Sequence, residues 1–214
     1  MSYVVQMIAE GEHLHQDFKM RVEDARKIAR TLVAFANTEG GRLLIGVKDN
    51  GSISGIQPEE EYHMIEGAAE LYCKPAIGFK TQVWKANNRA VLEVIVEPSK
   101  ARPHYCADET GEWHAYQRVD DRNVKANGVL LKVWQHEQSA RPADFKYNGR
   151  TRRLFALLHQ HGRLSFKSIS KMMRSGRAST EELLAQLVVW EVIGMEFTDT
   201  GCFFFLGDGM EELA

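Results

Sequence analysis

Apolar residues repeat at helical spacing early in the chain and then gather in one short run. Residues 22–37 place apolar side chains every three or four positions, which predicts an amphipathic helix. Gly40-Gly41 would end that helix. Residues 43–47 are wholly apolar, a pattern typical of a central strand that is covered on both faces. A further helix is expected to begin at Pro58, because proline is well tolerated at the first helical position.

Further along the chain, apolar and polar residues alternate with the period of a β-strand. Residues 77–83 and 91–96 predict a hairpin. The region around Tyr105 would pair with residues 113–119 in a second hairpin, and residues 126–138 predict another helix. Helices together with antiparallel pairs indicate an α+β fold with a mixed sheet.

Residues 139–149 show no periodicity, and their Pro, Asn and Gly residues interrupt regular structure. Domain boundaries fall in stretches of this kind. We therefore expect a first domain over residues 1–140, a linker over residues 141–149 and a second domain over residues 150–214.

The second domain has the pattern of a small helical unit. Residues 152–161 and 165–173 predict two helices. A third helix is expected from Ser179, as its N-cap, to about residue 192. A short hairpin within residues 195–206 would follow. Three helices and then a hairpin is the order of a winged helix-turn-helix domain.

Composition narrows the class of protein. The chain has 27 Lys and Arg residues against 29 Asp and Glu residues, so any attraction for nucleic acid must come from local clustering of charge. Its three cysteines are far apart, which argues against a disulfide framework and against a zinc module. The N-terminus does not have the pattern of a signal peptide, and no apolar run is long enough to span a bilayer. A cytoplasmic protein is the plain expectation.

One string in the first fifty residues is more specific than anything else in the chain. Its parts are Glu12, Asp17-Phe18-Lys19, Ala34 to Thr38, Gly40-Gly41, Ile45-Gly46-Val47 and Asp49. This string resembles the AlbA-like domain of Schlafen proteins and their bacterial relatives, and residues 116–119 fit that family's terminal strand. The resemblance covers roughly residues 9–135. It implies an AlbA-like mixed-sheet fold and, for the bacterial relatives, a role as transcriptional regulators.

In animal relatives, the resemblance implies a metal-dependent ribonuclease site formed by three acids. Carried over by motif, these positions are Glu12, Asp17 and Asp49, whose carboxylates could hold Mg²⁺ or Mn²⁺ for phosphodiester hydrolysis. Two departures count against this interpretation. Asp17 stands where the family more often has Glu, and Lys48 stands where relatives often have another acid. The alternative is that these three acids are solvated loop and turn residues.

Neighbouring residues leave two readings open. His13 and His15 could be metal ligands or ordinary surface residues. Lys19 could contact a phosphate or pair with an acid on the following helix. Basic residues between positions 100 and 125 are interleaved with aromatic rings, a composition that suits single-stranded nucleic acid, although such rings could equally belong to the core.

Some descriptions of this family carry a divergent AAA-type label, which implies ATP binding. A P-loop needs the pattern G-x-x-x-x-G-K-[ST], which this sequence lacks. Gly40-Gly41 precede a strand rather than a helix, so they offer no helix N-terminus to a phosphate. ATP is therefore not supported as a cofactor.

Charge is segregated in the second domain. Between residues 150 and 177 every charged side chain is basic, and from residue 178 onward every charged side chain is acidic. A basic block of this kind could face a duplex backbone, although Glu181-Glu182 at the start of the third helix would repel phosphates. The predicted nucleic-acid contacts are Lys19, Arg118, Arg122, Arg152, Arg153, Arg163, Lys167, Lys171, Arg174 and Arg177.

These patterns rank three functions. The first is a nucleic-acid-binding protein, with DNA as the expected partner and a transcriptional regulator as the expected role, forming a homodimer by analogy with other winged-helix regulators. The second is a metal-dependent nuclease that uses Glu12, Asp17 and Asp49. The third is a module without catalysis that dimerises or binds another protein. The altered acids favour the first function over the second, and the basic block favours it over the third.

Overall fold

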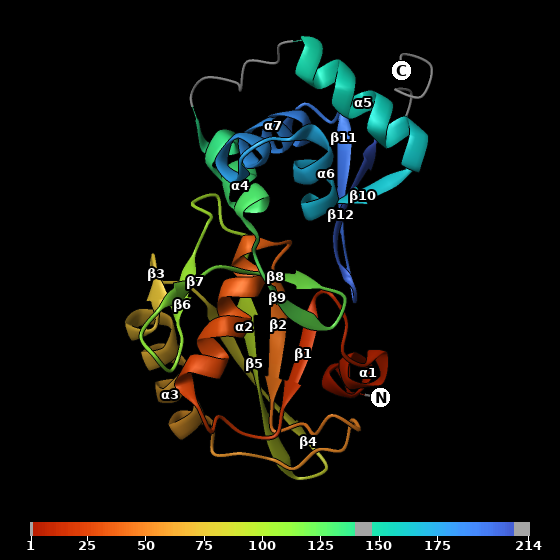
Figure 1. Ribbon diagram of the computed structural model, residues 1–214. Helices are drawn as coiled ribbons and strands as arrows, with labels where there is room; N and C mark the ends of the chain where they lie inside the picture. The colour runs from red at the N-terminus through yellow and green to blue at the C-terminus, as the bar shows by residue number, and fades with distance from the viewer. Residues whose placement is uncertain (1, 140–146, 208–214) are drawn as a thin grey trace. The chain divides into compact units, whose positions relative to one another are not determined.

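The structure is a computed structural model that describes residues 2–139 and 147–207, and it confirms the α+β class (Figure 1). The chain divides into two compact units, Met1–Ala126 and Asn127–Ala214. The helix expected at residues 126–138 is grouped with the second unit, whereas the sequence analysis placed it in the first domain. Residues 141–146 of the expected linker lie outside the described residues. Within the described ranges, no helix has both the length and the apolar character needed to cross a membrane.

The first unit begins with a helix and alternates between strands and helices. Its helices are α1 (Tyr3–Glu10), α2 (Ala25–Asn37) and α3 (Pro58–Leu71). Its strands are β1 (Gln16–Lys19), β2 (Gly41–Ile45), β3 (Cys73–Lys74), β4 (Lys80–Ala86), β5 (Arg89–Val96), β6 (Tyr105–Ala107), β7 (Trp113–His114), β8 (Tyr116–Val119) and β9 (Arg122–Lys125).

A four-stranded mixed sheet forms the centre of this unit, in the order β1-β2-β5-β4. β1 runs parallel to β2, whereas β2–β5 and β5–β4 are antiparallel. Asn87 and Asn88, both with positive φ, make the turn between β4 and β5, as the hairpin pattern predicted. The sequence pattern predicted neither α1 nor β1, and β1 lies in a polar stretch of the chain.

Both faces of the sheet are covered, as the apolar run at residues 43–47 predicted. α2 and α3 pack on one face, against Leu43, Ile45 and the alternate residues of β5. α1 packs on the other face, where Val4 and Met7 meet Leu44 (Figure 1). Successive strand residues point to opposite faces, so one apolar strand supplies both cores.

The second predicted hairpin is confirmed where β6 pairs with Trp113–His114, and it is wrong for residues 116–119. β6 pairs with β3 and β7, whereas β8 pairs with β9. β8 is held elsewhere because the carbonyl of Tyr116 accepts a hydrogen bond from Asn37 Nδ2, and the amide of Arg118 donates one to Thr38 Oγ1. These bonds fix β8 at the C-terminal end of α2, so it does not extend the strand of Trp113.

The three cysteines are free thiols, with Cys73 and Cys106 buried in directly opposed positions of β3 and β6. Burial raises the pKa of Cys73 to about 12 and that of Cys106 to about 11. Burial also raises the pKa of Cys202 to about 11. Thiols with pKa values this high stay protonated near neutral pH and are poor nucleophiles.

The second unit has one sheet and four helices among its described residues. Its helices are α4 (Gly128–Gln138), α5 (Gly149–His161), α6 (Phe166–Met173) and α7 (Arg177–Val189). Its strands are β10 (Arg163–Ser165), β11 (Ile193–Thr198) and β12 (Gly201–Leu206), joined antiparallel in the order β10-β12-β11.

Helix ends in this unit follow ordinary capping rules, with one correction. Asn148 and Thr151 form a capping box at the start of α5, and the hydroxyl of Ser165 caps α6. The N-cap predicted at Ser179 is wrong: α7 begins at Arg177 with Gly176 as its N-cap, which makes no side-chain cap hydrogen bond.

Candidate functional site

The structure brings together two of the three acids that the sequence singled out. Glu12 lies half-buried before β1, and its Oε1 accepts a hydrogen bond of 2.8 Å from the amide of Phe18. Asp17 lies on β1 and is 5% exposed. Burial raises the pKa of Glu12 above its ordinary value; the charge of Asp17 adds to the rise, and the Phe18 hydrogen bond opposes it.

Two cationic side chains neutralise Asp17. Its Oδ1 lies 3.2 Å from Nη2 of Arg118, and its Oδ2 lies 2.8 Å from Nζ of Lys19. Arg118 is 3% exposed, and its guanidinium also donates to Asn123 Oδ1 and to the carbonyls of His13 and Gln16. This buried ion pair joins β1 to β8 across about a hundred residues of chain.

Asp49 is separate from this pair. It is exposed in the loop after β2. Among the residues that the structure describes, no three His, Cys, Asp or Glu side chains gather closely enough to hold a metal ion. Since Asp17 already carries two cationic partners, the residues present do not fit Mg²⁺ or Mn²⁺.

The other candidates near these acids have partners of their own. His13 Nε2 lies 3.9 Å from a carboxylate oxygen of Glu10, and His15 Nε2 lies 3.5 Å from one of Glu39. Lys19 pairs with Asp17 on its own strand, and not with an acid of the following helix as one of its two readings predicted. Arg118, predicted to contact nucleic acid, is buried and structural, so we withdraw it from the candidate interface.

Arg122 is exposed on β9, and its Nε lies 4.0 Å from a carboxylate oxygen of Asp121.

Two of the aromatic rings between residues 100 and 125 are stacked with cations. Arg30 lies over the ring of Tyr116, and Lys74 lies over the ring of Trp113 at 4.2 Å. Both rings are half-buried. They are therefore shared between core packing and the surface.

Comparison with known protein families accounts for this first unit. Residues 12–127 match the family described as Schlafen, AlbA_2, which is more than half of the chain. The chain belongs to the Schlafen AlbA_2 family. That family is often linked to nucleic-acid binding and transcriptional regulation.

The AlbA_2 motif residues have architectural roles in this chain. The amide of Asn37 is buried, donates to the carbonyls of His104 and Tyr116, and accepts from the amide of His104. At Gly41, a Cβ atom would lie 2.4 Å from the ring of Phe35. The Ala-Asn-Thr and Gly-Gly segments therefore hold α2 against the sheet and loops.

Two solved structures show partial similarity to this AlbA_2 protein. One is a Corynebacterium diphtheriae protein, with 20% identity and a TM-score of 0.45, covering 69% of this chain and 33% of that chain. The other is the N-terminal domain of a RecG-related protein from Nitrosomonas europaea, with 22% identity and a TM-score of 0.42, covering 56% of this chain and 90% of that chain. The AlbA_2 protein thus spans about a third of the Corynebacterium chain.

The basic block of the second unit is on the surface. Its predicted contacts are all exposed: Arg152, Arg153, Arg163, Lys167, Lys171, Arg174 and Arg177. Arg163 is the outlier among them, because it lies on β10, pairs with Glu196 at 3.3 Å and stacks over the ring of Phe203. The other six lie on or between α5, α6 and α7.

Hydrogen bonds tie Arg153, and Arg150 of the same basic block, to the end of α6 and the turn that follows it. Arg150 Nη2 donates to the hydroxyls of Ser175 and Ser179, at 3.0 and 2.8 Å. Arg153 Nη2 donates to the carbonyl of Met172 at 2.7 Å. These bonds tie the start of α5 to the end of α6 and the start of α7. We call the exposed cations at this junction the basic cluster: Arg150, Arg153, Lys171, Arg174 and Arg177.

The acids expected to repel phosphates are engaged within the second unit. Glu181 Oε1 lies 2.7 Å from Nε of Arg177. Glu182 pairs with Lys132 at 3.0 Å and with His136 at 2.9 Å, both on α4. Burial opposes ionisation of Glu182, but the hydrogen bonds and charges of these two partners outweigh it and lower the pKa of the carboxyl. α4 and α7 consequently lie side by side (Figure 1).

Proposed function

We propose that this AlbA_2 protein binds double-stranded DNA through the basic cluster and acts as a transcriptional regulator. The observation that carries the proposal is the gathering of five exposed cations at one helix junction. Two of them, Arg150 and Arg153, are held in place by hydrogen bonds to neighbouring helices. Cations fixed at a surface attract phosphates and release counterions from the duplex.

We propose further that residues 150–207 form a winged-helix domain. The described order there is α5-β10-α6-α7-β11-β12, with the three strands in one antiparallel sheet. In helix-turn-helix domains the second helix of the motif enters the major groove. Here that helix would be α7, which follows the turn carrying Arg174 and Arg177.

The surroundings of α7 support binding that is dominated by phosphate contacts. Arg177, Ala178 and Ser179 are exposed, whereas residues 180–189 are buried or half-buried. α4 and its ion pairs with Glu182 cover part of the helix. Base contacts would therefore come from the first turn of α7, and most of the affinity from the cluster.

A nuclease is not favoured by the geometry, because Asp17 is bound by Arg118 and Lys19 and Asp49 lies apart. The homodimer expected by analogy stays a prediction.

A binding and cleavage assay separates the three functions. Labelled single- and double-stranded DNA and RNA would be mixed with the protein, with and without Mn²⁺, alongside a Glu12→Ala/Asp49→Ala variant.

The proposal predicts salt-sensitive duplex binding without cleavage. With about five phosphate contacts, the affinity should fall with salt with a log–log slope of about −4 to −5. Cleavage that requires Mn²⁺ and is lost in the variant would instead establish the nuclease. An absence of duplex binding at moderate salt would leave the interaction module.

A further inference from the structure

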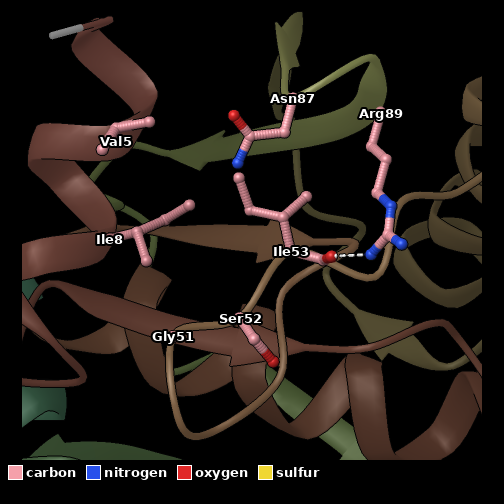
Figure 2. A pocket seen from close by; sticks show the side chains of 7 residues that line it. All are labelled: Val5, Ile8, Gly51, Ser52, Ile53, Asn87 and Arg89. Atoms are coloured by element: carbon pink, nitrogen blue, oxygen red, sulfur yellow. Dashed lines mark hydrogen bonds between the residues drawn. The ribbon is translucent and has the colours of Figure 1, made fainter.

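A pocket of about 490 Å³ opens in the first unit, and none of the three candidate acids lines it (Figure 2). Three segments build it: α1, the loop between β2 and α3, and the turn between β4 and β5. Its apolar lining comes from Val5, Ile8 and Ile53, and its polar lining from Ser52, Asn87 and Arg89. Pockets of a few hundred Å³ with apolar walls and a few polar groups are typical of small-molecule sites.

The apolar wall follows from how α1 packs. Val4 and Met7 are buried against the sheet, which turns Val5 and Ile8 sideways and leaves them half-buried. Ile53 faces them from the loop, as Figure 2 shows. Its position is set by the isolated bridge between Ile53 and Val47 at the end of the central strand. Covering this partly exposed apolar surface with another apolar group removes it from water, which favours binding.

Arg89 lies exposed at the polar side of this pocket. Its Nη1 donates to the carbonyl of Ile53 (Figure 2). Its stem lies against Gly55: Cβ and Cγ of Arg89 are 3.0 and 3.2 Å from where a Cβ of residue 55 would stand. Gly55 has a φ of +79°, so glycine suits both the backbone and the close approach of the arginine.

A guanidinium beside apolar walls has a specific use. Arginine carries five N–H donors in a planar fork, and the bond to Ile53 occupies one of them. Paired donors of this fork match a carboxylate in a bidentate arrangement. The hydrogen bond to Ile53 already restricts the side chain of Arg89, which lowers the entropy cost of ordering it on binding. Arg89 is the charged member of the pocket's lining, so the lining favours a negative charge.

We infer that this pocket binds a small carboxylic acid with an apolar body. The carboxylate pairs with the remaining donors of Arg89, and Asn87 lines the same pocket. The apolar body lies against Val5, Ile8 and Ile53. The AlbA_2 match begins at residue 12, so it does not include α1, which forms one wall of this pocket. The proposed DNA binding assigns no ligand to the pocket either.

The test uses 4-methylpentanoate as the probe and 4-methylpentanamide as its neutral match, with the full chain and binding followed by ligand-observed NMR and calorimetry. The wild-type protein should bind the acid at millimolar concentration or better, and the amide at least tenfold more weakly. Arg89→Gln should weaken binding of the acid at least tenfold. Lys85→Gln, which removes a charge from the same hairpin but does not line this pocket, should bind the acid like the wild type.

A second variant covers the case in which Arg89→Gln loses its fold. Ser52 is exposed at the pocket, so Ser52→Trp should fill it while Arg89 and the thermal unfolding midpoint are retained. Loss of binding in this variant supports the site. The inference is overturned if the wild type binds no acid at about 10 mM, roughly ten times the half-saturation of a millimolar site. It is also overturned if the amide binds as well as the acid, or if Arg89→Gln or Ser52→Trp binds like the wild type.

Discussion

The two units of this protein use arginine in opposite ways. In the first unit, Arg118 is buried, and its guanidinium holds β1 and β8 together through Asp17. In the second unit, Arg150 and Arg153 use one end of the guanidinium to fix their position and remain exposed. Residue type alone therefore does not distinguish a structural arginine from a binding one; the number of partners and the burial do.

The residues of the family motif and the residues of the proposed interface differ in the same way. The motif residues that identify the AlbA_2 family in this chain, such as Asn37 and Gly41, are committed to packing and internal hydrogen bonds. The basic block has no family motif, yet it supplies the exposed charge. A family match can thus rest on residues that build the fold, while the proposed DNA binding rests on residues outside the matched range.

The largest effect is expected at the buried ion pair. Arg118→Met should lower the free energy of unfolding by about 3–5 kcal/mol, because Asp17 would remain buried with one of its two cations removed. Urea unfolding measures this. Arg122→Gln, on the neighbouring strand and exposed, should change stability by less than about 0.5 kcal/mol. Equal effects of the two substitutions would show that burial does not separate the two arginines.

The next effect concerns affinity. The triple variant Arg150→Ala/Arg153→Ala/Arg174→Ala should bind duplex DNA roughly 100-fold more weakly at about 0.1 M salt, since three phosphate contacts are lost. Fluorescence anisotropy measures the affinity. A control that removes three exposed charges from the first unit, Lys27→Gln/Lys48→Gln/Lys100→Gln, should bind within about threefold of the wild type. Similar losses in both variants would point to bulk charge instead of the cluster.

Asn37 offers a smaller test within the motif. Asn37→Ala should cost about 2–3 kcal/mol of stability, because the amide of His104 and the carbonyls of His104 and Tyr116 lose their partner. Folded protein should still bind duplex DNA with unchanged affinity. A stable variant with weakened DNA binding would place Asn37 in the interface and contradict its architectural role.

The smallest effect is a pH dependence at the contact of α4 with α7. The pKa of Glu182 is lowered in the folded state, so its pairing stabilises the protein above the unfolded carboxyl pKa of about 4.3. That stability is lost as pH falls through the lower folded pKa. Because the carboxyl is 39% exposed, Glu182→Gln should cost less than about 1 kcal/mol at pH 6, and the difference should shrink below about pH 4. Lys132→Gln should show the same trend in thermal unfolding, and a difference that grows on acidification would contradict the account.

Much of the fold could be predicted because local pattern and final environment agree. The helix start at Pro58, the turn at Asn87-Asn88 and the two-sided strand at residues 43–47 each follow from nearby residues. α1 was missed because it has only eight residues, too few for a clear helical pattern. Its buried side chains, Val4 and Met7, are recognised as core only once the sheet that they pack against is known.

The candidate site was less predictable because it depends on distant partners. Nothing near Asp17 in the sequence indicates that Arg118 neutralises it, and nothing near Glu182 indicates Lys132 and His136. The α7 start at Arg177 could have been read from Gly176, yet Ser179 gave the stronger capping pattern. Charge segregation, by contrast, could be read directly, since exposed basic residues need no partner to be recognised.

The central claim is that the exposed cations at the α5–α6–α7 junction bind the duplex backbone. The most direct test is the salt dependence of duplex binding by the wild type and by the Arg150→Ala/Arg153→Ala/Arg174→Ala variant, measured side by side. The account predicts a log–log slope of about −4 to −5 for the wild type and about −2 for the variant. Equal slopes for the two proteins, or wild-type binding that does not respond to salt, would contradict it.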